Sequence, residues 1–159
     1  MALYNIRATN LYNMDETGTQ EGESSTRKVA GNASIRGTKV TKPSNTDWVS
    51  AIECISASGR RLQPAIVFKG GHLQSNWAPP ESFPRWHYKA TPSGWTNTDI
   101  AFNWIEEVFL PQTKPVSTRD WRLLILDGFS TYIDHFFQLV AFRNKVQLYY
   151  LPAYTSYRL

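Results

Sequence analysis

Two aspartates in this chain stand where carboxylates often do chemistry. Asp15 lies in NMDETG and Asp127 in LILDGFS, and each follows an apolar run and precedes a glycine by a few residues. A carboxylate at a strand end is rigid and open to solvent, so its oxygens suit a hard cation such as Mg²⁺ or Mn²⁺. Two such groups on neighbouring strands could share metal ions and support phosphodiester chemistry. An Asp-Gly pair after a strand is also a common turn, so the local pattern leaves both interpretations open.

The other residues that could do chemistry form no recognisable pattern. His72, His87 and His135 lack the spacing of metal ligands, and Ser130 lies in no nucleophile elbow. Cys54 is the single cysteine, which excludes an internal disulfide and a zinc site of the CxxC type. Its apolar surroundings indicate an inert core thiol.

The composition is that of one folded domain. The chain has 159 residues, of which 42% are hydrophobic, 14% aromatic and 19% charged, a balance that excludes disordered, collagen-like and coiled-coil chains. Every apolar run is shorter than the roughly 20 residues that span a bilayer, and the first residues lack the apolar region of a signal peptide. We therefore expect no membrane partner, and no pattern suggests a small-molecule substrate.

One stretch concentrates positive charge. The net charge is +4, from 17 Lys and Arg against 13 Asp and Glu, and Arg27, Lys28, Arg36, Lys39 and Lys42 follow one another without an acidic residue between them. Such a stretch suits the phosphate backbone of DNA, and we take Lys28, Arg36, Lys39 and Lys42 as candidate nucleic-acid-binding residues. A solvated loop or hairpin explains the charges equally well.

The elements that would position these residues follow from hydrophobic periodicity and from turn residues. Strands are predicted over residues 10–14, 48–57, 62–68, 122–126 and 146–151, and helices over 98–110 and 132–144. In the second helix, Phe136 and Phe137 are expected on the apolar side. Four prolines predict an irregular segment over 74–94, and residues 17–45 read as turns and short exposed strands. Early strands followed by alternating helix and strand indicate a mixed α/β sheet, with Asp15 and Asp127 at strand ends.

Seven blocks of this sequence resemble one family. They are LYNMDETG, SNTDWVSAIECISASG, LQPAIVFKG, SGWTN, WIEEVFLPQT, RLLILDG and LPAYTSYRL, in this order and nearly end to end. Together they are similar to the DDE superfamily endonuclease domain of transposases of the pogo and Tigger type, which is also found in centromere-protein-B-like proteins. The resemblance implies an α/β fold with a ribonuclease H-like mixed sheet flanked by helices.

The family likeness also implies an activity. Three acidic residues bind Mg²⁺ or Mn²⁺ in this family and drive nicking and strand transfer at transposon ends, and the first two match Asp15 and Asp127. The third belongs to a QPLD-like motif that should begin where the sequence stops, at Leu159. We therefore expect residues 1–159 to be a single partial catalytic core, incomplete at its C-terminus and without helix-turn-helix modules. It should bind metal weakly, lack useful transposase activity, and meet DNA and other transposase subunits in the nucleus.

Four positions depart from the family pattern. The family usually has histidine where this chain has Phe129, Tyr132, Tyr154 and Tyr157. A change from histidine to tyrosine needs a single C-to-T mutation, so three of these positions fit the hypothesis of a decayed transposon copy. Intact histidines in sibling copies would support that hypothesis, and tyrosine throughout would contradict it.

Two alternative functions stay open. The chain could be a domesticated or regulatory DNA-binding remnant that competes with an intact transposase. It could instead be a small metal-dependent phosphatase, although the second aspartate that such enzymes carry two residues after the first is absent from LILDGFS. In the related fold, a later helix covers one face of the sheet, so we expect apolar surface on that face and either marginal stability or association.

Overall fold

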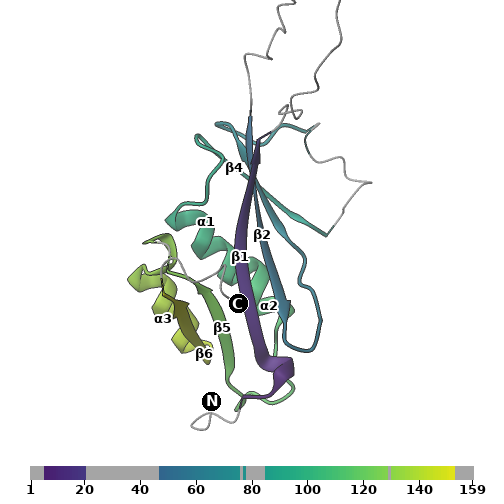
Figure 1. Cartoon of the computed structure of the whole chain (residues 1–159), viewed down its shortest axis with the longest axis vertical. Helices are drawn as coiled ribbons and strands as arrows, with labels where there is room; N and C mark the ends of the chain where they lie inside the picture. Colours follow the sequence, from purple (N-terminus) through teal and green to yellow (C-terminus); the bar gives the residue numbers. More distant parts are fainter. Residues whose placement is uncertain (1–5, 21–46, 76, 78–84, 129, 153–159) are drawn as a thin grey trace, which may run out of the picture.

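Alternating apolar residues build the strands of one mixed sheet (Figure 1). The computed structural model describes residues 6–20, 47–75, 77, 85–128 and 130–152. The strands lie in the order β4-β3-β2-β1-β5-β6. Their bounds are β1 Leu11–Gln20, β2 Trp48–Ser56, β3 Ala65–Lys69, β4 His87–Thr91, β5 Arg122–Asp127 and β6 Val146–Leu151.

The pairing of the strands confirms the predicted fold class. β2 runs antiparallel to both of its neighbours, β1 and β3, whereas β4 is parallel to β3, and β5 and β6 continue parallel to β1. Helical segments connect β4 to β5 and β5 to β6, and the second of these connections joins two parallel neighbours. The arrangement is the expected ribonuclease H-like α/β sheet with its helices.

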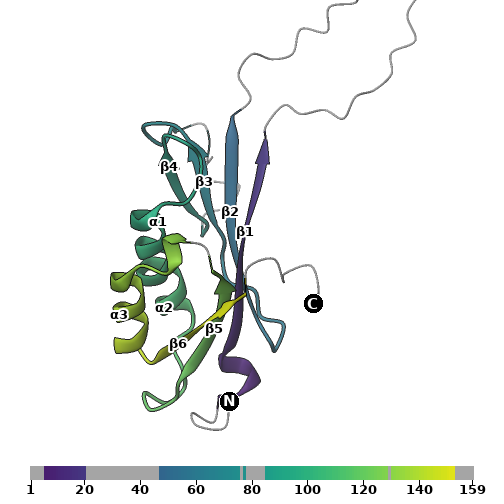
Figure 2. The ribbon, with the colours of Figure 1, turned by 60° about the vertical axis from the view of Figure 1, so that its left-hand side comes forward.

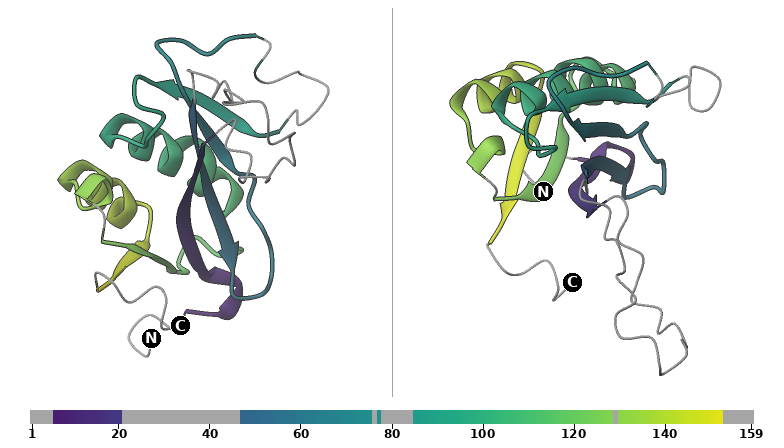
Figure 3. Two further views of the ribbon diagram at one scale, coloured as in Figure 1. Left: turned by 45° about the horizontal axis from the view of Figure 1, so that its top comes forward. Right: turned by 90° about the horizontal axis from the view of Figure 1, so that it is seen from above.

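The helices all cover one face of the sheet. Figure 2 shows α1, α2 and α3 on the same side, and Figure 3 shows the same two layers from above. One continuous helical stretch comprises α1 (Thr98–Asn103), a π-helical segment η2 (Trp104–Phe109) and α2 (Leu110–Gln112). α3 (His135–Arg143) is the other long helix, and short 3₁₀ turns occupy η1 (Ala8–Asn10) and η3 (Ser130–Tyr132). No helix in these described ranges is long and apolar enough to cross a membrane.

The hydrophobic core lies between this helical layer and the sheet. Alternate residues of each strand point into it, because successive side chains of a strand face opposite sides. Its fully buried members include Ile52 and Leu124 from the sheet and Ile105, Phe109 and Phe137 from the helices. At 25 cal/mol per Å² of apolar surface, each such side chain contributes about 1.5–3 kcal/mol when it is removed from water.

Local signals set where the helices begin. The Asn97 side chain accepts a hydrogen bond from the Ile100 amide (2.9 Å), and Asp134 caps α3 through the amides of Phe136 and Phe137. The first helix passes the expected stop at residue 110 and continues through Pro111 to Gln112. The π-helical turn, in which the Leu110 amide reaches the carbonyl of Ile105 five residues back, precedes the proline and loosens the usual ladder there.

Several predicted boundaries were wrong. β1 does not end at residue 14 but runs to Gln20, and β3 begins at Ala65 instead of residue 62. The irregular segment predicted over 74–94 contains β4, which pairs in parallel with β3 at the edge of the sheet. Phe136 faces outward and is 69% exposed, whereas Phe137 is buried as expected. Most of the predicted turn region over 17–45 lies outside the described residues.

A buried arginine anchors the start of β5. Arg122 donates to the Thr113 hydroxyl (2.7 Å) after α2 and to the Asn144 carbonyl (2.6 Å) after α3. Its guanidinium also lies over the Phe109 ring, 5.7 Å from the centroid. Burial lowers the pKa of Arg122, but the charge is retained because an arginine pKa starts far above neutrality. These contacts tie both helices to the strand whose far end carries Asp127.

Candidate metal centre

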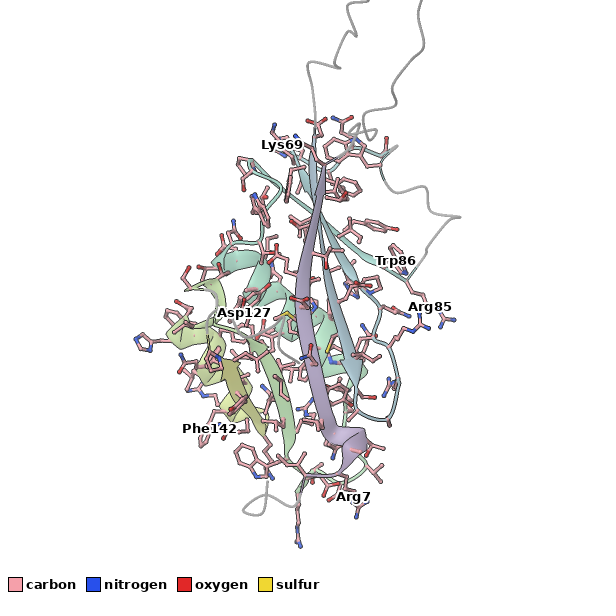
Figure 4. All side chains as sticks on the ribbon, in the orientation of Figure 1. Arg7, Lys69, Arg85, Trp86, Asp127 and Phe142 are labelled. Atoms are coloured by element: carbon pink, nitrogen blue, oxygen red, sulfur yellow. The ribbon has the colours of Figure 1, made fainter. Side chains whose placement is uncertain are left out.

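The sheet brings Asp15 and Asp127 together. β1 and β5 are parallel and their pairing ends with Asn13 opposite Ile125, so the next outward-facing residue on each strand is an aspartate. Both side chains lie on the face of the sheet away from the helices and both are exposed. Figure 4 labels Asp127 at the end of β5, beside β1.

The two aspartates line the same small pocket. It has a volume of about 130 Å³ and opens where β1 and β5 separate; its other lining residues are Met14, Glu16, Trp95 and Tyr132. Asp127 is the last residue of β5, as predicted. Asp15, however, is not at a strand end, because β1 continues beyond it in register with β2. Asp15 is nevertheless accessible on one side, since β5 stops pairing with β1 just before it.

The donor set of this pocket fits one hard cation. Mg²⁺ is often held by one or two carboxylates, with water completing its octahedron, and Asp15 and Asp127 supply that number. One Asp15 oxygen also accepts a hydrogen bond from the Glu16 amide (3.0 Å). Among the described residues, no group of three or more histidine, cysteine, aspartate or glutamate side chains is close enough to hold a metal. Asp15 and Asp127 are thus the two carboxylates in the described lining that suit a hard cation.

Glu16 also lines the pocket, but it faces the helical side of the sheet. Its Oε1 accepts hydrogen bonds from the Thr96 amide (3.2 Å) and the Thr96 hydroxyl (2.7 Å), and its Oε2 accepts one from the Tyr132 hydroxyl (3.2 Å). Glu16 was not among the residues predicted from the sequence. Strand alternation would have found it, because Tyr12 and Met14 are core residues and a carboxylate on that side needs hydrogen-bond partners.

Tyr132 is buried beside this carboxylate. Its hydroxyl donates to Glu16, while its carbonyl accepts from the Tyr150 hydroxyl of β6 (2.7 Å). Burial, together with the negative charge of Glu16, raises the pKa of Tyr132 well above its usual value. The phenol thus stays protonated and remains a hydrogen-bond donor throughout the neutral pH range.

Trp95, from the segment between β4 and α1, also lines the pocket. Its ring packs on Trp48 of β2, with ring centroids 4.4 Å apart, and its carbonyl accepts from the Thr91 hydroxyl (2.9 Å). Gly94 makes this approach possible, because its φ of 77° is unfavourable for other residues and a Cβ there would lie 2.5 Å from the Trp48 carbonyl oxygen. The motif block SGWTN therefore supplies one lining residue of the pocket, Trp95.

A second, larger hollow lies on the open face of the sheet beside Asp15. Its volume is about 460 Å³, and its lining includes Glu53, Ile55, Arg61 and Trp86. Glu53 pairs with Asp15 across β1 and β2, yet it does not line the first pocket. Asp15 thus stands between the two hollows, and only the first also contains Asp127.

The remaining candidate residues divide into two groups. Lys28, Arg36, Lys39 and Lys42 lie outside the described residues, as do Phe129, Tyr154 and Tyr157. Cys54 is buried, as predicted for a core thiol, and burial raises its pKa to about 12. A thiol with that pKa is a poor nucleophile at neutral pH.

Comparisons with known proteins agree with the motif blocks. The profile of the family described as DDE superfamily endonuclease matches residues 45–159, a range that includes Asp127 and begins after Asp15. The chain is also similar to a protein from Cochliobolus lunatus named MFS-type transporter clz9, with 31% identity over 160 residues. That alignment covers 99% of this chain but 17% of the relative, so the chain spans about a sixth of the relative's length. No solved structure is significantly similar to the chain.

Proposed function

This chain belongs to the DDE superfamily endonuclease family, and from that premise we propose that residues 1–159 form a metal-binding core of a transposase-type endonuclease. The observation that carries the proposal is the placement of Asp15 and Asp127 on one face of two parallel strands, lining one pocket. The motif blocks support the pogo and Tigger branch of the family. The transport named for the fungal relative is not carried over, because the chain matches a small part of that protein.

The residues of the pocket have defined roles in this proposal. A bound Mg²⁺ or Mn²⁺ would supply Lewis-acid polarisation of a DNA phosphodiester and a more acidic water. Asp15 and Asp127 would hold the cation, and their exposure on the open face leaves room for a DNA strand to approach. Because the described residues contain no group of three possible ligands, we propose that residues 1–159 by themselves have little nicking activity.

The test measures metal binding before activity. Mn²⁺ titration of the purified chain, followed by electron paramagnetic resonance, should show one bound ion, and Asp127→Asn should abolish it. Asp120→Asn, near the opposite end of β5, is the matched control and should bind like the unmodified chain. Equal Mn²⁺ binding by the chain and by its Asp127→Asn variant would contradict the proposal.

A plasmid-nicking assay with Mg²⁺ or Mn²⁺ then tests the expected inactivity. We expect no nicking above the level of the Asp127→Asn variant. Robust nicking that Asp127→Asn abolishes would show that residues 1–159 are an active endonuclease and would overturn this part of the proposal while supporting the metal centre.

DNA is the proposed substrate class, and the basic stretch is its proposed contact. Removing Lys28, Arg36, Lys39 and Lys42 together by substitution with glutamine should weaken DNA binding for all sequences and reduce its salt dependence, because phosphate contacts release counterions. Replacing four other cations, Arg7, Lys69, Lys114 and Arg119, removes the same charge and serves as the control. Fluorescence anisotropy against NaCl concentration measures both.

Other subunits of the same family are the proposed protein partners, and the nucleus is the proposed compartment. The apolar residues on the open face of the sheet support association. An inactive chain that pairs with intact subunits should inhibit an intact transposase in a dominant manner, which is the regulatory alternative. Excision of a reporter transposon with and without co-expressed residues 1–159 tests this, and unchanged excision would argue against pairing.

A further inference from the structure

Glu16 stands next to a proposed metal ligand but is turned away from it. We propose that Glu16 is a positioning residue whose carboxylate ties the strand carrying Asp15 to the segment that follows Asp127, and so sets the separation of the two aspartates. The positioning role of Glu16 rests on the proposed metal centre, whereas the hydrogen bonds of Glu16 do not depend on it.

The need for such a tie follows from the strand pairing. In the described part of the chain, backbone pairing of β1 with β5 ends at Asn13 and Ile125, two residues before the aspartates. Asp15 is still held by β2, and Asp127 is still held by β6, in register with Leu151. At the level of the two carboxylates, backbone pairing between β1 and β5 therefore does not fix the distance between Asp15 and Asp127.

Hydrogen bonds of Glu16 cross this gap. Tyr132 lies five residues after Asp127, in the 3₁₀ turn η3. Its hydroxyl donates to Glu16 Oε2 at 3.2 Å. Tyr132 is in turn fixed to β6, because its carbonyl accepts from the Tyr150 hydroxyl. A displacement of the Asp127 side relative to β1 would stretch the Glu16–Tyr132 bond, so the bond resists that displacement.

Thr96 holds the other oxygen of the same carboxylate. Two donors from one residue, the amide and the hydroxyl, reach Oε1 and fix the orientation of Glu16. Thr96 is 6% exposed and directly precedes Asn97, the cap of α1, so the tie also joins the helical layer. Because both oxygens are engaged, Glu16 is a poor candidate for a third metal ligand and a good one for a fixed support.

The tie also gives Tyr132 a role. The family pattern has histidine at position 132. Here the Tyr132 hydroxyl donates to the Glu16 carboxylate, so tyrosine keeps a hydrogen-bond donor at this position.

Tyr132→Phe removes one bond of the tie and leaves a buried ring of the same shape. We expect it to weaken Mn²⁺ binding by about 10- to 100-fold, the range typical of residues that orient a ligand. Glu16→Gln keeps an oxygen for Thr96 and presents an amide that can donate to the Tyr132 hydroxyl, so it exchanges a bond to a charged group for a neutral one and should weaken Mn²⁺ binding less than Tyr132→Phe does. The double variant should bind Mn²⁺ about as weakly as Tyr132→Phe alone, since the bond between residues 16 and 132 is already lost in that single variant. Ile105→Val, a small change in the buried helical layer, is the control for stability and should bind Mn²⁺ normally.

Hydrogen exchange of the metal-free protein provides the independent readout. Tyr132→Phe should accelerate exchange at the amides of residues 130–132, and Ile105→Val should not. Unchanged exchange, or Mn²⁺ binding equal to that of the unmodified chain, would overturn the proposal. If the unmodified chain binds Mn²⁺ no better than Asp127→Asn, the proposed metal centre fails, and hydrogen exchange still decides whether the tie exists.

Discussion

The two faces of the sheet carry different kinds of side chain. The face under the helices carries fully buried side chains such as Ile52 and Leu124, whereas the opposite face carries Asp15, Asp127 and Ile55, the last of which is 46% exposed. The same strands supply both sets, because neighbouring side chains in a strand point in opposite directions. One face stabilises the fold, and the other presents groups that can bind a ligand.

Glu16 is the exception that links the two faces. It is a carboxylate on the helical side of β1, and its three hydrogen bonds satisfy it there. The open face also includes Tyr149, which is 54% exposed. The comparison can be tested by substituting matched residues on the two faces.

The largest expected effect concerns stability. Leu124→Ala, on the helical side of β5, should lower the free energy of unfolding by about 2–5 kcal/mol, because the residue is fully buried and the cavity cannot collapse completely. Leu123→Ala, the next residue and half-buried on the open face, should cost less than half of this. Urea denaturation measures both, and equal losses would show that the two faces are not energetically distinct.

The next effect distinguishes Asp15 from Glu53 by their influence on Mn²⁺ binding. Their carboxylates both lie on the open face, and the two residues are paired across β1 and β2. Asp15→Asn should weaken Mn²⁺ binding by at least about 100-fold, because a ligand should matter no less than the groups that orient it. Glu53→Gln, opposite Asp15 but outside the pocket that contains Asp127, should change the affinity less than about 3-fold. A strong effect of Glu53→Gln would place the ion between β1 and β2 instead.

Buried titratable groups on the helical face should make the free energy of unfolding depend on pH in the alkaline range. Burial raises the pKa of Cys54 from 9.0 to about 12, and that of Tyr150 from 10.0 to about 12. The unfolded chain ionises first as pH rises, so the stability present below pH 9 should be lost progressively between about pH 9 and 12. Urea midpoints at pH 7 and pH 10.5 measure this loss. Cys54→Ala should make the loss smaller, and an unchanged pH dependence in that variant would contradict the assignment.

The smallest effect is expected on the open face. Ile55→Ser should change the free energy of unfolding by no more than about 0.5 kcal/mol, as is usual for an exposed side chain. It should also reduce any self-association that covers this face, which sedimentation velocity can detect. Ile52→Val, three residues earlier on the buried face, should cost about 0.5–1.5 kcal/mol without affecting association. A large stability loss from Ile55→Ser would mean that Ile55 is buried in solution.

Features that depend on neighbouring residues were predictable from the sequence. A helix was expected to begin at residue 98, and it does, because the Asn97 side chain caps it and capping involves residues within one turn. The apolar run over residues 122–126 was expected to be a strand, and β5 forms there, although its burial alternates between the two faces. The motif blocks also identified the family correctly at the level of the DDE superfamily.

Features that depend on distant partners were not predictable. β1 extends to Gln20 through polar residues and a glycine because β2 pairs with it along that whole length. β4 lies in a segment flanked by prolines and becomes a strand by pairing with β3. Neither partner can be seen from the local sequence, since both ladders join residues far apart in the chain.

The sequence by itself determined the chemistry that is available: two exposed carboxylates after apolar runs, the caps of the helices and the alternation that sorts each strand into two faces. Only the tertiary structure decided that Asp15 and Asp127 line one pocket, that Glu53 does not, and that Glu16 is bound by Thr96 and Tyr132. The physical reason is that side-chain identity and local periodicity are short-range properties. The distance between two carboxylates is instead set by strand register and by hydrogen bonds between distant segments.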